Sequence, residues 1–526
     1  MNRIFFLAFI LSTINNSFAQ IYEQKYTDKI TEVFQFITTK YVDTIDQKRI
    51  TRVAIEGILE SLDPHSVYIP KEKVKETEEP LSGNFDGIGI QFNILKDTII
   101  VISPISGGPS EKLGILSGDR IIYIEDELVA GIDITNKGVQ KRLKGPKGTI
   151  VNIKILRRGL SDLIQYEIER DRIPIHSVDA EYMIDNRNGY IKLNKFSGNT
   201  HTEFENAIFR LKDQGMTGLI LDLSNNGGGY LQASLFLADH FLSNDKLMLT
   251  VKGKAGLPDE VPSTPFGGFE NGRLVIMIDE GSASASEIVS GAVQDHDRGV
   301  IVGRRSFGKG MVQERIELKD SSVIRLTIKR FYTPSGRCIQ KPYDEGIEQY
   351  YEEVYKRYET GELINQDSVQ FPDSLKYKTT NQRDVYGGGG IMPDIFVPLD
   401  TNWSSALYMN IARKGHQNTF CLKYVNENRS TLNTNYENVS DFNNRFDIKT
   451  EIEDDFIKFI KKENITFKAE EYERSQKVIY AQLKALIARN LWGTSAYFYV
   501  INNVNPIFIK AIKVISSEQY LKTLNP

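Results

Sequence analysis

The sequence predicts a multidomain α/β protein with an N-terminal helical segment, a small β-domain, an α/β core and a helical C-terminal domain. Its 526 residues suffice for about three to four domains. Apolar residues recur at helical spacing near both ends of the chain, and short strands with glycine turns lie between them. From Gly189 onward, apolar runs of strand length alternate with helical ones, which is typical of an α/β core.

The composition narrows the classes of function. Hydrophobic residues make up 40% and charged residues 25% of the chain, which excludes a disordered, collagen-like or polytopic membrane protein. The net charge of -4 implies no general affinity for nucleic acid or anionic membranes. The two cysteines, Cys338 and Cys421, and six scattered histidines form no metal-binding pattern. We therefore expect no metal and no cofactor, and a single Cys338–Cys421 bridge stays open.

The first 19 residues have the pattern of a secretory signal peptide. Arg3 precedes the apolar run Ile4–Leu11, and small residues end the segment at Ala19. The alternatives are an N-terminal anchor or a buried helix, but the run is far shorter than the ~20 residues of a membrane span. We expect cleavage before Gln20, export to the periplasm or cell envelope, and no membrane span in the mature chain.

Residues 20–78 form the expected helical segment, because apolar positions recur at spacings of three and four. The prolines of Leu62–Pro70 divide it into two helices. Residues 79–161 form the expected β-domain. Its predicted strands are Gly87–Ile94, Thr98–Ile105, Asp119–Asp126 and Thr149–Arg157, and its predicted helices are Pro109–Leu113 and Thr135–Leu143.

Residues 162–400 form the predicted α/β core, whose site belongs at the C-terminal ends of its strands. The expected strands are Gly189–Leu193, Gly218–Leu223, Leu274–Asp279, Gly299–Arg304, Val312–Leu318 and Ser322–Phe331, and the expected helices are Thr202–Gln214, one ending near Leu242, and Ala285–Val293. Residues 341–385 are polar and tyrosine-rich and indicate an insertion or a covering segment. Residues 401–526 carry helical periodicity and are predicted to form a separate domain.

One segment of the core carries the strongest chemical pattern. Asp279–Ile288 (DEGSASASEI) lies between a predicted strand and a predicted helix. A serine there can project into a cleft while the following amide, at a helix N-terminus, stabilises an oxyanion. The alternative is a simple helix cap, since serine and glutamate are common at helix starts.

Two further loops add to this pattern. Ser306–Gln313 (SFGKGMVQ) places Lys309 between two glycines after a strand. It is not a P-loop, because GxxxxGK[ST] is absent. Leu221–Leu231 (LDLSNNGGGYL) brings three glycines between a strand and a helix, where a backbone can approach a ligand closely. Alone, the first loop also fits a surface lysine, and the second fits a phosphate cradle or a tight turn equally well.

Together, the order and spacing of these segments resemble the carboxyl-terminal processing peptidases, or tail-specific proteases, which use a serine–lysine dyad. The resemblance covers about residues 27–400 and includes Ser61–Ile69, Phe331–Gln340 and Val385–Ile395. Phe85–Phe92 and Gly118–Ile124 are similar to the family's PDZ domain. The resemblance implies a PDZ domain over residues 79–161 and a protease core over residues 162–400.

The resemblance also implies roles for individual residues. The same pattern leaves Ser282 and Ser286 as neighbours that are easily confused with the nucleophile. The implied roles are Ser284 as nucleophile, Lys309 as general base, Gln313 as the residue that orients the lysine, and the Gly228 and Ala285 amides as the oxyanion hole.

The glycine loop departs from the family pattern. The family often has DLRxNPGG, whereas this chain has DLSNNGGG, so Ser224 replaces an arginine and Gly227 a proline. The glycine pair that supplies the amide remains. We expect a looser loop, which affects fine positioning and not the reaction class.

A serine–lysine dyad makes a physical demand on Lys309. Lysine has an ordinary pKa of about 10.4 and cannot accept a proton while charged. Burial must lower that pKa, and Met311 and Val312 are the expected apolar cover. The neutral amine then takes the Ser284 proton and later protonates the leaving amine.

The PDZ-like domain suggests how substrate is selected. Successive amides of Gly87, Ile88, Gly89 and Ile90 would hold a C-terminal carboxylate, and the two isoleucines would line an apolar pocket. The alternative is an ordinary strand start. In the family such a domain binds the substrate tail and can gate the active site.

The sequence therefore predicts an exported serine endopeptidase that cleaves proteins with free C-terminal tails near their C-terminus. A homodimer or an adaptor partner, bound through the helical ends, stays open.

One rival is a non-catalytic PDZ scaffold or apolar-ligand binder, which does not need Lys309. Another is an acyl hydrolase, which the absence of GxSxG disfavours. A Ser-His-Asp site is disfavoured because His296 would lie roughly 18 Å along a helix from Ser284, and His65 is interpreted as a turn or cap residue.

Overall fold

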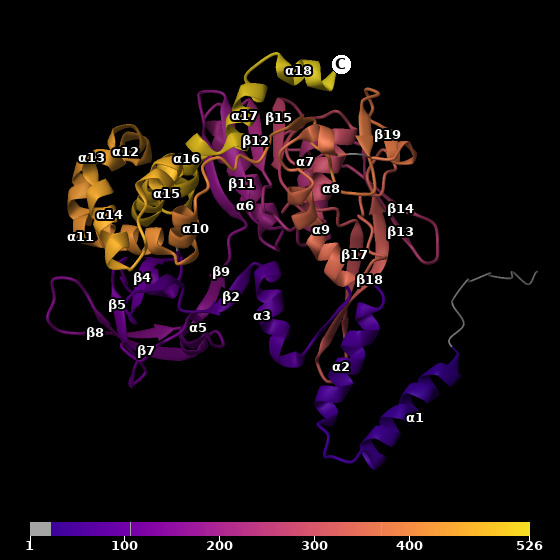
Figure 1. Ribbon diagram of the computed structural model, residues 1–526, viewed down its shortest axis with the longest axis horizontal. Helices are drawn as coiled ribbons and strands as arrows, with labels where there is room; N and C mark the ends of the chain where they lie inside the picture. Colours follow the sequence, from indigo (N-terminus) through magenta and orange to yellow (C-terminus); the bar gives the residue numbers. More distant parts are fainter. Residues whose placement is uncertain (1–22, 106, 370, 526) are drawn as a thin grey trace, which may run out of the picture.

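The computed structural model describes residues 23–105, 107–369 and 371–525 (Figure 1). The predicted signal peptide, residues 1–19, lies outside them. None of the helices in the described part of the chain has the length and hydropathy of a bilayer span. The predicted fold class, a multidomain α/β protein with helical ends, is confirmed.

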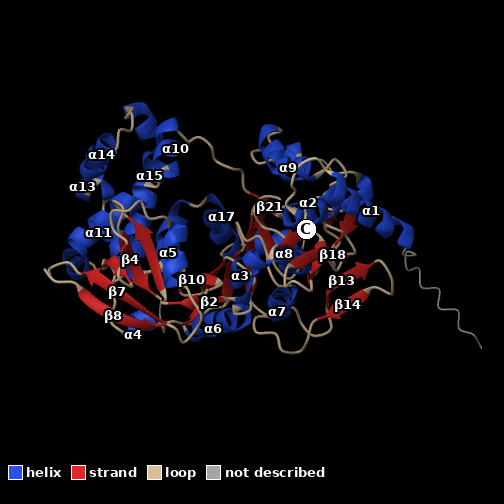
Figure 2. Ribbon diagram, turned by 90° about the horizontal axis from the view of Figure 1, so that it is seen from below, coloured by secondary structure: helices blue, strands red, loops and turns tan. Residues whose placement is uncertain are grey.

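The N-terminal segment is helical but also adds a strand to the core. Its elements are α1 (Gln24–Lys40), α2 (Gln47–Glu60), β1 (Val67–Ile69) and α3 (Lys71–Ser82). Helix α1 buries none of its residues and projects away from the body of the molecule (Figures 1 and 2). Strand β1 pairs antiparallel with β18 (Val323–Tyr332). The proline-containing segment that was predicted to separate two helices therefore contributes a strand to a sheet.

The small β-domain is built on a sheet of order β3-β4-β5-β7-β8, with β6 beside β5. Strand β3 lies at the edge of this sheet in the described structure. A separate ladder of β2 and β9 connects the domain to the rest of the chain. The elements are β2 (Asn84–Gly87), β3 (Ile90–Ile94), β4 (Ile99–Pro104), α4 (Pro109–Lys112), β5 (Arg120–Ile124), β6 (Glu127–Leu128), α5 (Asn136–Leu143), β7 (Ile150–Leu156), β8 (Ile164–Glu169) and β9 (Asp171–Pro174).

The core contains a sheet of order β10-β11-β12-β15-β16-β21, parallel except for the β10–β11 pair. Its strands bury both faces, as parallel strands do. Leu219 and Leu221 pack with the helices α6 to α8, whereas Ile220 faces the other side. The elements are β10 (Val178–Met183), β11 (Asn188–Leu193), α6 (Thr200–Asp213), β12 (Gly218–Asp222), α7 (Leu231–Phe241), β15 (Arg273–Ile278), α8 (Ala285–Asp295), β16 (Val300–Gly303) and β21 (Ile395–Phe396).

The second face of this sheet is covered by the end of the chain. Helix α17 (Pro506–Ile515) packs Ile507, Phe508 and Ala511 against it, and α18 (Gln519–Leu524) follows. The sequence interpretation had placed residues 401–526 in one separate domain. The structure differs because the β-strands of the core expose an apolar second face, and α17 is the amphipathic helix that covers it.

A second, antiparallel sheet borders the core, with order β1-β18-β13-β14 and β17 beside β18. Its remaining strands are β13 (Leu247–Gly253), β14 (Asp259–Pro262) and β17 (Met311–Glu317). The β13–β14 hairpin was not predicted, because its short apolar run follows a helix directly and periodicity does not separate the two.

The remaining segments are helical or short. The predicted covering segment contains α9 (Ile347–Glu359) and the hairpin β19 (Lys376–Lys378) and β20 (Asp384–Tyr386). The C-terminal helices share their own apolar core and touch the β-domain, where Arg158 donates to the Asn426 carbonyl. These helices are α10 (Ala406–Arg413), α11 (His416–Asn435), α12 (Val439–Arg445), α13 (Ile448–Glu451), α14 (Glu453–Lys462), α15 (Ala469–Trp492) and α16 (Thr494–Ile501).

Candidate active site

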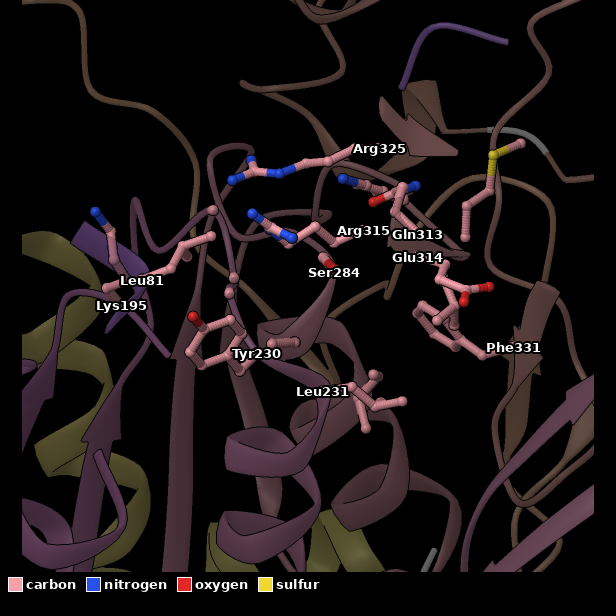
Figure 3. Close-up of a pocket in the computed structure, with 18 of the residues that line it drawn as sticks. Leu81, Lys195, Tyr230, Leu231, Ser284, Gln313, Glu314, Arg315, Arg325 and Phe331 are labelled. Carbon is pink, nitrogen blue, oxygen red and sulfur yellow. The ribbon is translucent and has the colours of Figure 1, made fainter. Parts of the chain in front are cut away.

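The three segments singled out from the sequence meet at one cavity of about 520 Å³ (Figure 3). Ser284 follows the end of β15, the glycine loop follows the end of β12, and Lys309 follows β16. All three lie beyond the C-terminal ends of parallel strands, as expected for an α/β core. Apolar side chains complete the cavity wall, namely Leu231, Ile288, Met311, Val312 and Phe331.

Ser284 occupies a strained corner directly before α8. Its φ of +56° and ψ of −110° are unusual for a residue with a side chain. Such strain persists only where the surrounding structure enforces it, and it concentrates at functional sites. Here it turns the chain sharply from a strand into a helix and leaves Ser284 at the cavity surface.

The two neighbouring serines are held elsewhere. Ser282 Oγ donates to the Leu223 carbonyl at 2.8 Å and accepts from the Asp279 amide at 2.9 Å. Ser286 Oγ donates to the Asn226 carbonyl at 2.8 Å. Both side chains are fully buried and neither lines the cavity. Of the three serines, only Ser284 is in a position to meet a substrate.

Lys309 lies in the same cavity, and burial lowers the pKa of its amine from the ordinary value. The Arg325 guanidinium lowers that pKa further, while the carboxylates of Glu287 and Asp63 raise it. Within the described residues no hydrogen bond joins Lys309 Nζ to Ser284 Oγ. Catalytic hydrogen bonds in substrate-free enzymes often tighten only when substrate binds.

The carboxylate of Glu287 ties the serine loop to the lysine loop. Oε2 accepts from the Ser284 amide at 2.7 Å and from the Lys309 amide at 2.9 Å. Oε1 accepts from Ser306 Oγ at 2.5 Å and from the Gly308 amide at 2.7 Å. Burial raises the pKa of Glu287, and the four donors oppose that rise. Sequence reasoning saw only a helix-start glutamate, because its partners come from a loop that the sequence does not place beside it.

The two predicted oxyanion donors differ in their present partners. The Ala285 amide, at the first position of α8, has no acceptor within the described residues, so it is free for a ligand. The Gly228 amide donates to Asn226 Oδ1 at 2.9 Å. Gly228 has a φ of +95°, and a Cβ there would lie 2.9 Å from Ser284 Cβ, so only glycine fits. Gly228 must exchange Asn226 for the substrate oxygen to act as predicted.

The glycine loop is anchored from below by a lysine. Lys192 Nζ donates to the Ser224 carbonyl at 2.5 Å and to Asp222 Oδ1 at 3.1 Å. Lys192 is buried and comes from β11. A cation therefore supports the loop at the point where this chain has Ser224. A Cβ added at Gly227 would meet no atom within 4 Å.

Gln313 lines the cavity but its amide contacts Thr327 rather than Lys309. Its Nε2 donates to Thr327 Oγ1 at 3.3 Å, and Thr327 Oγ1 donates to Asp63 Oδ1 at 3.1 Å. Asp63 also accepts from Ser66 Oγ. The turn between α2 and β1 thus supports the strand that carries Gln313, a connection between distant segments that the sequence analysis missed.

The histidines considered from the sequence are outside the site's chemistry. His296 Nε2 bonds to the Leu247 carbonyl at 2.7 Å, at the far end of α8. His65 bonds to the Tyr350 hydroxyl at 2.9 Å. Burial, with the nearby Lys309 charge, lowers the pKa of His65 to about 4. Neither histidine contacts Ser284.

The predicted carboxylate loop of the β-domain lies at the start of its edge strand β3. The Ile88 carbonyl accepts from Ser110 and the Gly89 carbonyl from the Ile105 amide. Ile88 is buried in the domain core, whereas Ile90 is only partly buried. Gly87 pairs with Asp171 in the β2–β9 ladder.

The described residues form neither a metal site nor a disulfide. Residues 23–105, 107–369 and 371–525 hold no grouping of three or more His, Cys, Asp or Glu side chains suited to a metal ion. Cys338 and Cys421 are both free thiols.

Four family models match the chain. They are peptidase family S41 over residues 187–352, a PDZ domain over residues 87–168, the activating protease CtpB N-terminal domain over residues 11–73, and a family of unknown function (DUF8443) over residues 407–493. The core and the β-domain thus define a serine-type peptidase that carries a PDZ domain.

Two curated relatives, each matched over 62% of this chain, agree with these family models. The carboxy-terminal processing protease CtpB of Bacillus subtilis (strain 168) is 36% identical over 327 residues, 62% of this chain and 67% of that protein. The carboxy-terminal-processing protease of Bartonella bacilliformis is 35% identical over 344 residues, 62% of this chain and 76% of that protein. The solved photosystem II D1 C-terminal processing protease shares 27% identity over 60% of this chain and 83% of its own, with a TM-score of 0.35. The chain belongs to the carboxy-terminal processing proteases of peptidase family S41.

Proposed function

We propose that this protein is an endopeptidase that cuts protein substrates near their C-terminus with Ser284 as nucleophile and Lys309 as general base. The observation that carries the proposal is the single cavity in which a strained Ser284 and a partly buried Lys309 meet. A non-catalytic scaffold has no need of either feature.

The chemistry follows from the positions of these groups. Neutral Lys309 takes the Ser284 proton as Oγ attacks the peptide carbonyl. The Ala285 amide, with Gly228 once it is released from Asn226, stabilises the oxyanion. Protonated Lys309 then delivers its proton to the leaving amine, and water hydrolyses the acyl-enzyme.

Substrate tails would be recognised by the PDZ domain. Strand β3 has a free edge in the described structure, so a peptide can add to the sheet beside it. The Gly87–Ile90 loop at its start would hold the terminal carboxylate through its amides.

Helix α3 offers a path from the PDZ domain to the cavity. Glu79 pairs with Lys144 of the PDZ domain at 2.5 Å, and the adjacent Glu78 pairs with Arg315 at the cavity at 2.5 Å. We infer that tail binding changes the position of α3 and so gates the site.

Cleavage of an unfolded protein with an apolar C-terminal tail tests this function. Wild type should cut the free-tail substrate, and amidation of the tail should reduce the rate about 10- to 100-fold, because a charge-assisted contact is lost. The Ser284→Ala variant should bind the tail equally and cut nothing. Wild-type protein that binds but never cuts would instead support a scaffold.

The exposed stripe of α1 suggests a homodimer. Tyr26, Ile30 and Val33 are each more than half exposed on a helix that buries none of its residues. We propose a second copy of this chain as the partner, because isolated helices of this kind gain stability by covering an apolar face. Sedimentation should show a dimer that Ile30→Glu dissociates and the control Gln35→Glu does not. A monomeric wild type would contradict the proposal.

Export is proposed from the sequence of residues 1–19. Mass spectrometry of the protein from the cell envelope should find a chain that begins at Gln20. A chain that retains Met1 and stays in the cytoplasm would contradict export.

A further inference from the structure

Two arginines face each other across the β17–β18 ladder at the mouth of the cavity. Arg315 pairs directly with Arg325, two positions along from the Gln313–Thr327 pair. Cross-strand partners point to the same face of a sheet, and like charges directly opposite each other destabilise it. Figure 3 shows both guanidinium groups reaching to the same side of Ser284. Such a pair suits a site that receives an anion.

Only one of the two arginines is neutralised by the protein. Arg315 bonds to Glu78 at 2.5 Å and to Glu317 at 3.1 Å. Arg325 is partly buried and makes no ion pair within the described residues, although it lines the cavity. A partly desolvated guanidinium without an acceptor is costly, so a bound acceptor would stabilise it.

The carboxylate nearest in sequence does not fill this role. Glu314 also lines the cavity, but it alternates to the other face of β17, opposite Leu326. In Figure 3 its carboxylate points away from the Arg315 guanidinium. Lys195, on another wall, is a second cation without an ion pair in the part of the chain described.

We propose that Arg325, with Arg315 beside it, binds a carboxylate of the substrate close to the scissile peptide bond. The planar guanidinium fork matches a carboxylate with two parallel hydrogen bonds. This site is separate from the PDZ loop and makes the protease selective for cleavage beside an acidic group. The carboxylate comes from an acidic side chain or from the α-carboxylate of a short tail. The inference rests on the proposed peptidase activity.

Cleavage rates of wild type and an Arg325 variant on matched pairs of peptides test the site. A quenched peptide with a neutral residue at each position near the cut is compared with the same peptide carrying glutamate there. The two peptides of a further pair both end near the cut. One has a free C-terminus and the other an amidated one. Because Arg325 also lowers the pKa of Lys309, all rates are taken on the alkaline plateau of each enzyme.

Wild type should cut the peptide with the carboxylate about 10- to 100-fold faster in kcat/KM, as expected for a charge-assisted contact. Arg325→Gln should lose that preference, so that its kcat/KM values on the two peptides of a pair become equal. Arg325→Lys should restore part of it, and the matched control Lys195→Gln should keep it. Wild type and variant share the same PDZ domain, so any effect of that domain on the rates cancels when their preferences are compared. Whichever peptide pair shows the preference identifies the source of the carboxylate.

The opposite outcomes are distinct. Equal rates by wild type within both peptide pairs would overturn the inference and leave the peptidase intact. An equal loss by Arg325→Gln on both peptides would also overturn it, since Arg325 would then act only on the site itself. If wild type cut neither the peptides nor the protein substrate, the proposed function would be overturned.

Discussion

Replacing Lys309 by methionine is expected to abolish proteolysis while making the folded protein more stable. Activity should fall about 10⁴-fold, because the other basic group at Ser284, the Glu287 carboxylate, already accepts four hydrogen bonds. Stability should rise because a partly desolvated amine is replaced by an apolar chain of similar length. Rates on the protein substrate and thermal unfolding of the same samples measure both effects.

The pH dependence follows from the direction of the Lys309 pKa. Burial lowers that pKa below 10.5, so the lysine is charged and inactive at low pH, and kcat/KM should rise as pH passes the lowered value. The cost of burying the charged amine is present below that value and fades as pH rises towards 10.5, the pKa of the unfolded chain. The stabilisation by Lys309→Met should therefore be largest at low pH and shrink in alkali.

A surface control separates these effects from a general loss of charge. Lys319→Met changes an exposed lysine in the turn between β17 and β18 and should alter neither activity nor the pH profile. Retention of more than a hundredth of wild-type activity in Lys309→Met would contradict its role as the base.

Replacing Glu287 by glutamine is expected to cost both activity and stability. The carboxylate accepts four hydrogen bonds, two at each oxygen. An amide keeps one acceptor and turns its NH₂ group towards donors, which leaves buried amides unpaired at about 1–3 kcal/mol. Activity should fall about 10²-fold, because the Ser284 and Lys309 loops lose their common anchor. Unfolding in urea and kcat/KM on the neutral peptide measure the two effects.

A neighbouring glutamate serves as the control. Glu280 lies four positions before Ser284 and pairs with Arg304 at the edge of the same loop. Glu280→Gln should keep activity within a few-fold, as for partly exposed ion pairs. If Glu287→Gln behaved like this control, the carboxylate would not be the anchor of the site.

The sequence was sufficient for features set by local pattern. Alternation of strands and helices predicted the α/β core, and the motifs around Ser284 and Lys309 identified the family, both of which are confirmed. These succeed because strand and helix periodicity and loop glycines are properties of consecutive residues. The roles given to Ser284, Lys309, Gln313, Gly228 and Ala285 stay predictions for the experiments above.

Contacts between distant segments required the tertiary structure. Only the fold showed that Glu287 anchors two loops, that the Asp63 turn supports Gln313 through Thr327, and that α17 completes the core. Only strand register placed Arg315 opposite Arg325. The reason is physical: a sequence pattern specifies which face of an element is apolar or charged, but which other element meets that face depends on packing across the whole chain.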